Sequence, residues 1–323
     1  MNYKHLSPGL ADAPDFPDIL DLPGSLSKRL ADVPGRLLGI DAGGSATRVV
    51  VLAGGKLSTL PSAPPMNATI TPGIADRLLD MIGTAEPDAV GIGLPGVRTA
   101  GTAGELTQIL TKLSGIPVHV TDDGITATFG AFGGRPGIVV HAGTGSGACG
   151  WDGTRWARAG GRGYLLGDEG SAYWLGRAAV SAAMHWEDGT GGSAAVHRAV
   201  TATAGCPLPD LARKIYQNPS ERAILTPFAP VISDLAARDS VALSLTHEAA
   251  TYLASLAEAL RNRLGRELPV CGAGGVLSAP VIWERFASLT EASAPLVPPE
   301  VGAALLAAEV LQGRVPGEEE ERG

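Results

Sequence analysis

Residues 37–52 read LLGIDAGGSATRVVVL, two apolar runs separated by a short polar segment. The first run ends at Asp41 and the second begins at Arg48. The two glycines between them allow a sharp turn, since glycine accepts backbone conformations that other residues avoid. The stretch therefore predicts a strand, a tight glycine turn and a second strand.

A second stretch repeats this design. An apolar run at 137–142 leads into the glycine-dense segment 143–147, and an Asp-Gly pair at 152–153 then lies between two tryptophan-bearing arms. An Asp-Gly pair between such arms is typical of a β-hairpin. We therefore expect two similar halves, each built on a strand, a glycine turn and a strand.

Elsewhere, apolar runs of strand length alternate with segments of helical periodicity, which is typical of α/β folds. Gly265 is positioned to end a long amphipathic helix. The expected strands are residues 89–94, 118–120 and 268–271, and the expected helices are residues 74–82, 240–264 and 300–311.

Composition excludes several classes of function. The 323 residues point to two domains, at about 150 residues per domain. The 25 basic and 33 acidic residues give a net charge of −8 without a basic cluster, which argues against binding to nucleic acid or to an anionic membrane. No apolar run approaches a membrane span, and no basic start precedes an apolar stretch. We expect a cytoplasmic protein with a small-molecule partner.

The chain divides into four expected segments. Residues 1–35 form an N-terminal extension, which could be disordered or could pack on the body or on a partner. Residues 36–121 form an N-terminal lobe, joined by the C-terminal helix at about 300–313. Residues 122–299 form a C-terminal lobe, and residues 314–323 form a disordered acidic tail.

Two glycine patterns, Gly91-x-Gly93-x-x-Gly96 and Gly145-x-Gly147-x-x-Gly150, match the dinucleotide-binding spacing. That fingerprint also needs a helix directly after the turn and an acidic residue about 20 positions later. We expect a loop at 99–104 after the first pattern and the hairpin after the second, so both fail. The chain also lacks the G-x-x-x-x-G-K-[ST] phosphate-binding loop.

Two glycine-rich tips remain, and tips of this kind present backbone N–H groups that phosphate oxygens can approach closely. Residues 38–52, 118–176 and 270–311 resemble the sugar kinase/Hsp70/actin superfamily, specifically its BadF/BadG/BcrA/BcrD-type ATPases and their N-acetylglucosamine kinases. The most specific part is the stretch GGRGYLLGDEGSAYW at 160–174. The resemblance implies a two-lobed actin-like (ribonuclease H-like) α/β fold, with the nucleotide and the sugar in the interdomain cleft.

The resemblance also assigns roles to two aspartates. Asp122 matches the general base, which accepts the proton of the attacking sugar hydroxyl during phosphoryl transfer. Asp41 matches the aspartate that orients water around Mg²⁺. We take Asp123 as the N-cap of a helix over 124–132. The reverse assignment, with Asp123 as the base, stays open.

Three groups of residues match the family's ATP-binding segments and eight residues match its sugar-contacting positions. Arg162 stands where the animal N-acetylglucosamine kinases have tryptophan, and an ion pair with Asp168 or Glu169 is the alternative to a substrate contact. The ATP-binding residues are Gly43, Gly44 and Ser45, then Gly143, Thr144 and Gly145, then Gly272, Gly274 and Gly275. The sugar-contacting residues are Asn67, Asp122, Ser146, Gly147, Gly161, Arg162, Gly163 and Asp168.

The expected function is an ATP- and Mg²⁺-dependent kinase that phosphorylates N-acetylglucosamine or glucosamine at the 6-hydroxyl, in a chain that can form a homodimer. One alternative is an ATPase activator of a CoA-ester dehydratase or reductase, whose relatives share an iron–sulfur cluster between subunits. The widely spaced Cys149, Cys206 and Cys271 argue against it and are expected to be buried, reduced thiols. A non-catalytic amino-sugar sensor is the other alternative.

Overall fold

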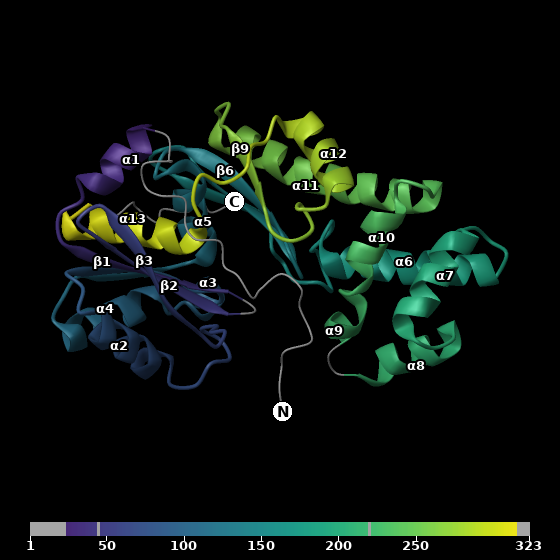
Figure 1. The fold of residues 1–323 in the computed structure, drawn as a ribbon, viewed down its shortest axis with the longest axis horizontal. Helices are drawn as coiled ribbons and strands as arrows, with labels where there is room; N and C mark the ends of the chain where they lie inside the picture. The colour runs from purple at the N-terminus through teal and green to yellow at the C-terminus, as the bar shows by residue number, and fades with distance from the viewer. Residues whose placement is uncertain (1–23, 44–45, 219–220, 315–323) are drawn as a thin grey trace. The chain divides into compact units, whose positions relative to one another are not determined.

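The computed structural model describes residues 24–43, 46–218 and 221–314, which form two compact units (Figure 1). Of the described residues, unit 1 combines those up to Gly133 with residues 296–314, and unit 2 runs from Gly134 to Pro295. Each unit has its own sheet covered by helices, so the expected two-lobed α/β fold is confirmed.

Unit 1 is built on a five-stranded sheet of order β3-β2-β1-β4-β5. Strand β1 pairs antiparallel with β2 and parallel with β4, which pairs parallel with β5. Figure 1 shows α13 on one side of this sheet and α2 and α4 on the other. The strands are β1 (Arg36–Ala42), β2 (Thr47–Ala53), β3 (Lys56–Ala63), β4 (Ala89–Gly93) and β5 (Val118–Thr121), and the helices are α1 (Gly24–Ala31), α2 (Ile74–Ala85), α3 (Val97–Ala100), α4 (Ala103–Ser114), α5 (Asp123–Phe132) and α13 (Pro299–Leu311).

Glycines on one face of this sheet allow α5 and α13 to approach it closely. A Cβ atom on Gly39 or Gly91 would overlap backbone carbonyls of α13, and one on Gly93 would overlap Thr126 of α5. The glycines of the 91–93 pattern therefore serve helix packing. The short helix α3 follows Gly96 directly and α4 begins at Ala103, so the loop expected at 99–104 is wrong except at residues 101–102.

Helix α5 belongs to unit 1 because it packs against the start of α13. A Cβ atom on Gly130 would lie 2.7 Å from the carbonyl oxygen of Pro298, and one on Gly302 would overlap the carbonyl oxygen of Thr126. Such close packing of small residues ties the two helices together. The unit boundary consequently follows Gly133, whereas the sequence placed it after residue 121.

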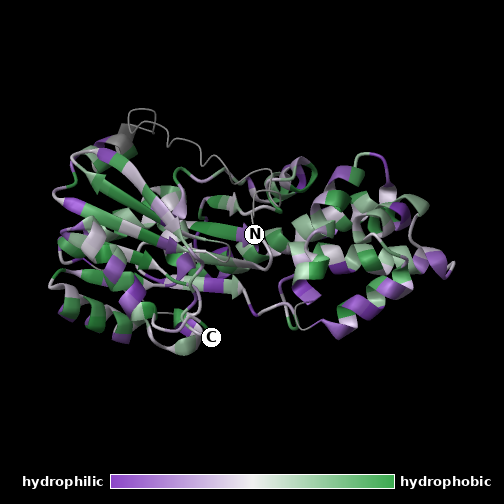
Figure 2. Cartoon of the chain, turned by 60° about the horizontal axis from the view of Figure 1, so that its bottom comes forward, coloured by the Kyte–Doolittle hydropathy of each residue, from purple (hydrophilic) through white to green (hydrophobic). Residues whose placement is uncertain are grey.

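Unit 2 is built on a four-stranded sheet of order β8-β7-β6-β9, against which α11 packs. Further helices, α6 to α10, form a second apolar core together with the start of α11. Figure 2 shows green and purple alternating along this helical part, as expected of amphipathic helices. The strands are β6 (Gly137–Ala142), β7 (Ser146–Trp151), β8 (Trp156–Gly160) and β9 (Val270–Ala273), and the helices are α6 (Ala172–Glu187), α7 (Ala194–Ala204), α8 (Leu208–Gln217), α9 (Glu221–Leu225), α10 (Phe228–Leu235), α11 (Ser240–Leu264) and α12 (Pro280–Thr290).

Several local predictions are confirmed. The Asp-Gly pair lies in the β7–β8 turn, where Gly153 has φ 105° and the Asp152 carboxylate accepts the N–H groups of Thr154 and Arg155. The long helix ends at Leu264, and Gly265 follows it with φ 64°.

No described helix is both long enough and apolar enough to cross a membrane.

The last part of the expected N-terminal extension is helix α1, whose Leu26 and Leu30 are buried. This part of residues 1–35 therefore packs on the body, where Leu26 lies beside Gly133. Residues 1–23 and the acidic tail beyond Arg314 lie outside the described residues.

Cys149 and Cys271 are buried free thiols, as expected, whereas Cys206 is only half-buried.

Candidate active site

The carboxyl ends of three parallel strands meet at one edge of the unit 1 sheet. Asp41 of β1 pairs in register with Gly93 of β4, and Gly93 pairs with Thr121 of β5. Asp122 follows Thr121 directly. The strand topology therefore places two of the predicted site residues, Asp41 and Asp122, at the same edge.

Asp41 is a buried carboxylate at this edge. Its side chain is 6% exposed and accepts a 3.2 Å hydrogen bond from the Thr126 hydroxyl. Burial, and after it the nearby carboxyls of Asp123 and Glu300, raise the pKa of Asp41 to about 7, against the opposing effects of Thr126 and Arg48. Among the described residues, two further carboxyl groups and one guanidinium thus act electrostatically on Asp41.

The structure corrects the assignment of the helix cap between β5 and α5. Asp122 has extended backbone angles, φ −68° and ψ 143°, and its Oδ1 accepts the N–H of Gly124 at 3.0 Å. Asp122 is therefore the N-cap, and the prediction of Asp123 as the cap is wrong, because β5 ends at Thr121 and Asp123 is already the first helical residue. The cap bond fixes the Asp122 carboxylate at the edge of the sheet.

Asn67 lies between β3 and α2, and it contacts the loop that follows β4 at the same edge. The N–H of Ala68 donates to the carbonyl of Pro95, and a Cβ on Gly96 would overlap the Asn67 side chain. The Oδ1 atom of Asn67 accepts the N–H and the hydroxyl of Thr69 at 2.9 and 2.6 Å. That oxygen is thus held in a local turn, while the residue as a whole stands beside the strand end.

The first glycine turn joins β1 to β2. Gly43 donates its N–H to the carbonyl of Ala46 at 2.9 Å, which closes the turn immediately after Asp41 and Ala42. The other two residues predicted for this phosphate loop, Gly44 and Ser45, lie outside the described residues.

In unit 2, the second glycine loop is fixed to the start of α6. The carbonyls of Gly143 and Thr144 accept the N–H groups of Ala172 and Tyr173 at 2.8 and 3.4 Å. These bonds satisfy two of the helix N–H groups that have no partner within the helix. The loop is therefore a rigid connection between β6, β7 and α6.

Asp168 lies against the other side of this loop. It is 5% exposed and has φ 59°, a left-handed conformation that is unusual for a residue other than glycine. Burial raises the pKa of its carboxyl, against the opposing effects of hydrogen bonds from the N–H groups of Ser146 and Gly163. Ser171, not Asp168, caps α6 by accepting the N–H of Trp174 at 3.2 Å.

The structure gathers most of the predicted sugar-contacting residues of unit 2 around Asp168. Gly161 donates its N–H to the carbonyl of Ser146 at 2.9 Å, and Gly147 lies beside Gly161 where β7 and β8 pair. Gly163 contributes its N–H to the Asp168 carboxylate. Arg162, between them in sequence, is exposed.

The cation that acts on Asp168 is Arg222 of α9, which the sequence did not single out. Its guanidinium lies 5.0 Å from the centre of the Tyr164 ring, and its Nε is buried without a hydrogen-bond partner among the described residues. No local sequence signal marks it, because only the tertiary packing of α9 brings it to the segment around Asp168.

A cavity of about 950 Å³ opens beside the same loop, within unit 2. Gly143, Thr144 and Gly275, three of the predicted ATP-binding residues, line it. Its apolar wall includes Ala172, Leu175, Ala229, Val276 and Val281, and its polar side chains include Ser233, Asp234 and Glu284. This volume is in the range of small-molecule and cofactor sites.

The other two glycines of the predicted adenosine segment have packing roles. A Cβ on Gly272 would lie 2.7 Å from the Trp283 ring, inside the core. Gly274 has φ 98°, and a Cβ there would lie 2.5 Å from the carbonyl oxygen of Ala142. Together they bring the chain after β9 close to the end of β6, which leaves Gly275 facing the cavity.

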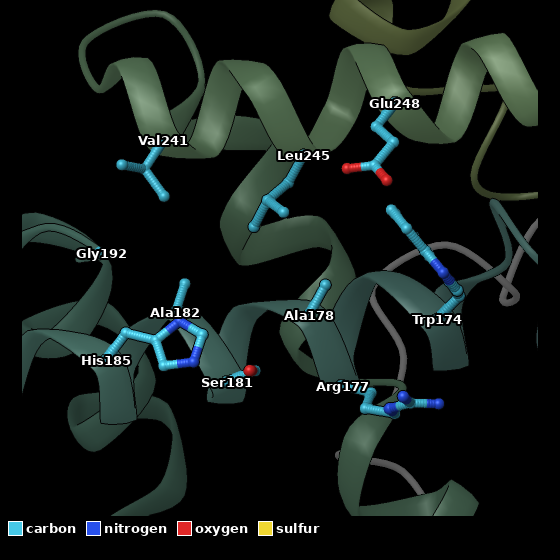
Figure 3. A pocket seen from close by; sticks show the side chains of 10 residues that line it. All are labelled: Trp174, Arg177, Ala178, Ser181, Ala182, His185, Gly192, Val241, Leu245 and Glu248. Carbon is cyan, nitrogen blue, oxygen red and sulfur yellow. The ribbon is translucent and has the colours of Figure 1, made fainter. Parts of the chain in front are cut away.

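A second cavity, of about 410 Å³, lies between α6 and α11 (Figure 3). Leu245 and Glu248 project from α11 toward α6, whose Trp174, Ser181 and His185 line the opposite wall. No predicted site residue lines this cavity, so it provides a site for control substitutions.

Within residues 24–43, 46–218 and 221–314, no three histidine, cysteine, aspartate or glutamate side chains gather closely enough to bind a metal ion.

Comparison with known proteins finds one matching family model and several similar solved structures. The model of the BadF/BadG/BcrA/BcrD ATPase family matches residues 38–307. No curated protein matches the chain. Among solved structures, a protein from Chromobacterium violaceum that is provisionally described as an N-acetylglucosamine kinase is 27% identical, with a TM-score of 0.63 over 86% of this chain and 99% of the other.

Two more distant structures share the fold. A protein from Porphyromonas gingivalis with the same provisional description is 21% identical, with a TM-score of 0.65 over 85% of this chain and 98% of the other. A ROK-family glucokinase from Streptomyces griseus, solved with glucose and AMPPNP, is 17% identical, with a TM-score of 0.52 over 86% of this chain and 100% of the other.

Proposed function

The chain belongs to the BadF/BadG/BcrA/BcrD ATPase family, and from that premise we propose that it transfers the γ-phosphoryl group of ATP to a hydroxyl of an amino sugar. N-acetylglucosamine and glucosamine are the proposed acceptors, at the 6-hydroxyl. One observation carries the proposal. Loop 143–147 borders the large cavity through Gly143 and Thr144, and it borders the Asp168 carboxylate through Gly145 and Ser146.

The cavity is the proposed site for the adenosine part of ATP. Its apolar walls suit a nucleobase, and the carboxylates of Asp234 and Glu284 can accept hydrogen bonds from ribose hydroxyls or an exocyclic amine. Gly143 and Thr144 end the cavity with backbone that phosphate oxygens can approach. The triphosphate would then extend along the loop toward Asp168.

Asp168 is the proposed acceptor for sugar hydroxyl groups. A charged carboxylate accepts stronger hydrogen bonds than a neutral oxygen, and burial excludes competing water. The N–H groups of Ser146 and Gly163 hold this carboxylate in one orientation. The proposed sugar therefore binds to a preformed group on a rigid loop. Asn67 and Arg162 remain predicted sugar contacts.

Asp122 is the proposed general base. The N-cap bond from the Gly124 N–H occupies its Oδ1 and fixes the carboxylate at the sheet edge. A base in this reaction needs position more than strength, since phosphoryl transfer depends chiefly on orientation and charge stabilisation. Asp123 is the alternative base, and it lies within electrostatic reach of Asp41.

The residues around Asp41 fit a hydrated Mg²⁺ ion. They offer hard carboxyl oxygens, and one buried oxygen, Oε2 of Glu300, has no hydrogen-bond partner among the described residues. Asp41 would hold such an ion through water. When bound with ATP, Mg²⁺ supplies positive charge that neutralises the phosphate oxygens.

A coupled ADP-release assay over a panel of sugars and amino sugars tests this function. The proposal predicts turnover stimulated by N-acetylglucosamine or glucosamine, and a loss of at least about 100-fold in Asp122→Asn, since general bases contribute roughly that much or more. Asp76→Asn, an exposed carboxylate on α2, is the matched control. Sugar binding without ADP release would instead identify a sensor.

The activator alternative needs cysteines that can reach a shared cluster, whereas Cys149 and Cys271 are buried in the unit 2 sheet. Burial raises the pKa of the Cys271 thiol to about 12, which disfavours the thiolate that iron would bind. The homodimer stays a prediction, which sedimentation of the purified chain tests.

A further inference from the structure

Glu300 is a buried carboxylate whose partners within the described residues are incomplete. It is 5% exposed, and its Oε2 has no hydrogen-bond partner among these residues. The carboxylate does accept the N–H of its own residue, at the start of α13. Burial raises the pKa of the Glu300 carboxyl, against the opposing effects of its own N–H and of Arg48. Because a buried polar oxygen without a partner is costly, such an atom in a native fold calls for a proton, a bound ion, a water molecule or a ligand.

The packing of α13 directs Glu300 toward the Asp41 edge. The backbone of Glu300 lies directly against Gly39, two residues before Asp41 on the same face of β1. Side chains of a helix tilt toward its N-terminus, and α13 begins at Pro299. The Glu300 carboxyl is near enough to act electrostatically on Asp41.

The charges around this pair are unbalanced. Strand β1 contributes Asp41 and α13 contributes Glu300, and among the described residues the cation that acts on both carboxyl groups is Arg48 of β2. Arg48 stands directly opposite Asp41 in the β1–β2 register. One guanidinium does not neutralise both Asp41 and Glu300, and buried carboxyl groups need either a proton or a further cation.

We propose that Glu300 is a second carboxylate of the cation site and that, together with Asp41, it holds the water shell of the divalent ion that accompanies the nucleotide. Mg²⁺ keeps several water molecules when it binds to proteins, so two carboxylates can hold it without direct ligation. The inference rests on the proposed function for the nucleotide, but not for the acceptor sugar.

Binding of Mn²⁺, as a paramagnetic substitute for Mg²⁺, tests this role without any turnover. Electron paramagnetic resonance of free Mn²⁺ gives its dissociation constant for the intact chain in the presence of ADP. Outer-shell carboxylates typically contribute about 10–100-fold to metal affinity, so Glu300→Gln is expected to raise that constant by at least about tenfold. Glu300→Asp, which keeps the charge but retracts it, is expected to give an intermediate value.

Glu105→Gln is the matched control, because Glu105 also lies in the first turn of a unit 1 helix but is exposed. It is expected to bind Mn²⁺ within about twofold of the unmodified chain, as distant surface changes are nearly neutral. Thermal unfolding of each variant shows whether it is folded. If Glu300→Gln does not fold, the Mn²⁺ dissociation constants of Glu300→Asp and Glu105→Gln are compared instead, and a weaker affinity in Glu300→Asp supports the proposal.

Unchanged Mn²⁺ affinity in folded Glu300→Gln and Glu300→Asp would overturn the proposal and make Glu300 a structural group. Failure of the proposed function gives a different result. A chain that binds Mn²⁺ and ADP through Glu300 but phosphorylates no sugar retains this inference and loses the kinase assignment.

Discussion

Gly145 and Asp168 are in direct contact: a Cβ atom on Gly145 would lie 2.6 Å from Oδ2 of Asp168. Position 145 thus has no room for a side chain while the Asp168 carboxylate keeps its place. This contact joins the proposed phosphate-binding backbone to the proposed sugar-binding group. A substitution at Gly145 is therefore expected to change the affinity for the sugar.

Replacement of Gly145 tests this contact. Gly145→Ala is expected to displace the Asp168 carboxylate and to weaken binding of N-acetylglucosamine by about tenfold or more, because a displaced carboxylate loses charge-assisted hydrogen bonds worth roughly 1.5–3 kcal/mol each. ADP binding should change less. Isothermal titration calorimetry measures both affinities, and Gly83→Ala, where nothing lies within 4 Å, is the control. Equal loss for both ligands would show general disruption of the loop.

Arg222 is expected to set the pH range of sugar binding through Asp168. Burial raises the pKa of Asp168 and Arg222 opposes that rise. The charged form is therefore lost as the pH falls through the raised pKa, and sugar binding is lost with it. Arg222→Gln removes the opposing charge, so the midpoint of this loss should move to higher pH.

Sugar affinity measured by calorimetry between pH 4 and pH 8 gives that midpoint. Arg198→Gln, an exposed guanidinium on α7, should leave it unchanged. A midpoint that moves to lower pH in Arg222→Gln, or that does not move, would show that Arg222 does not stabilise the charged form of Asp168.

The large cavity of unit 2 can be filled selectively. Ala237 is exposed at its rim, and Ala237→Trp is expected to reduce ADP affinity by about tenfold or more, since the indole would occupy space that the nucleoside needs. Ser181→Trp, at an exposed position of the second cavity, should leave ADP affinity unchanged. The opposite ranking of the two variants would place the nucleotide in the cavity of Figure 3.

Asp152 is expected to make folding stability depend on acid pH. Burial opposes its charged form, but the N–H groups of Arg155 and Thr154 and their side chains outweigh burial and lower its pKa from 3.8 to about 2. A lowered pKa stabilises the fold above the ordinary value, and that contribution disappears as the pH falls from about 4 to about 2.

Thermal unfolding of Asp152→Asn measures this contribution. The variant should melt at a lower temperature than the unmodified chain at pH 7, and the difference should shrink toward pH 2. A constant difference across this range would show that the charge of Asp152 contributes nothing.

The elements that could be predicted from the sequence are those whose signals are local. The Asp152-Gly153 turn and the Gly265 stop of α11 depend on a few adjacent residues, and both lie where they were expected. The cap before α5 was misplaced by one residue, because the choice between Asp122 and Asp123 depends on where β5 ends.

Other features depend on contacts between distant segments. Gly91 and Gly93 resemble a nucleotide-binding motif in the sequence, whereas in the fold they admit α13 and α5. Glu300 has the appearance of an ordinary first-turn acid of a helix, and only the packing of α13 on β1 buries it beside Asp41. Likewise, Arg222 reaches Asp168 only through the placement of α9.

Phosphorus NMR of the chain with ATP, Mg²⁺ and N-acetylglucosamine tests the central claim most directly, because it identifies the acceptor of the phosphoryl group. Transfer to the 6-hydroxyl predicts a new phosphomonoester signal, split by the two protons of the adjacent carbon, that grows with ADP and is lost in Asp122→Asn. The same measurement with glucosamine completes the test, because glucosamine is the other proposed acceptor. Inorganic phosphate as the sole new product with both sugars, or no consumption of ATP with either, would contradict the assignment of a sugar kinase.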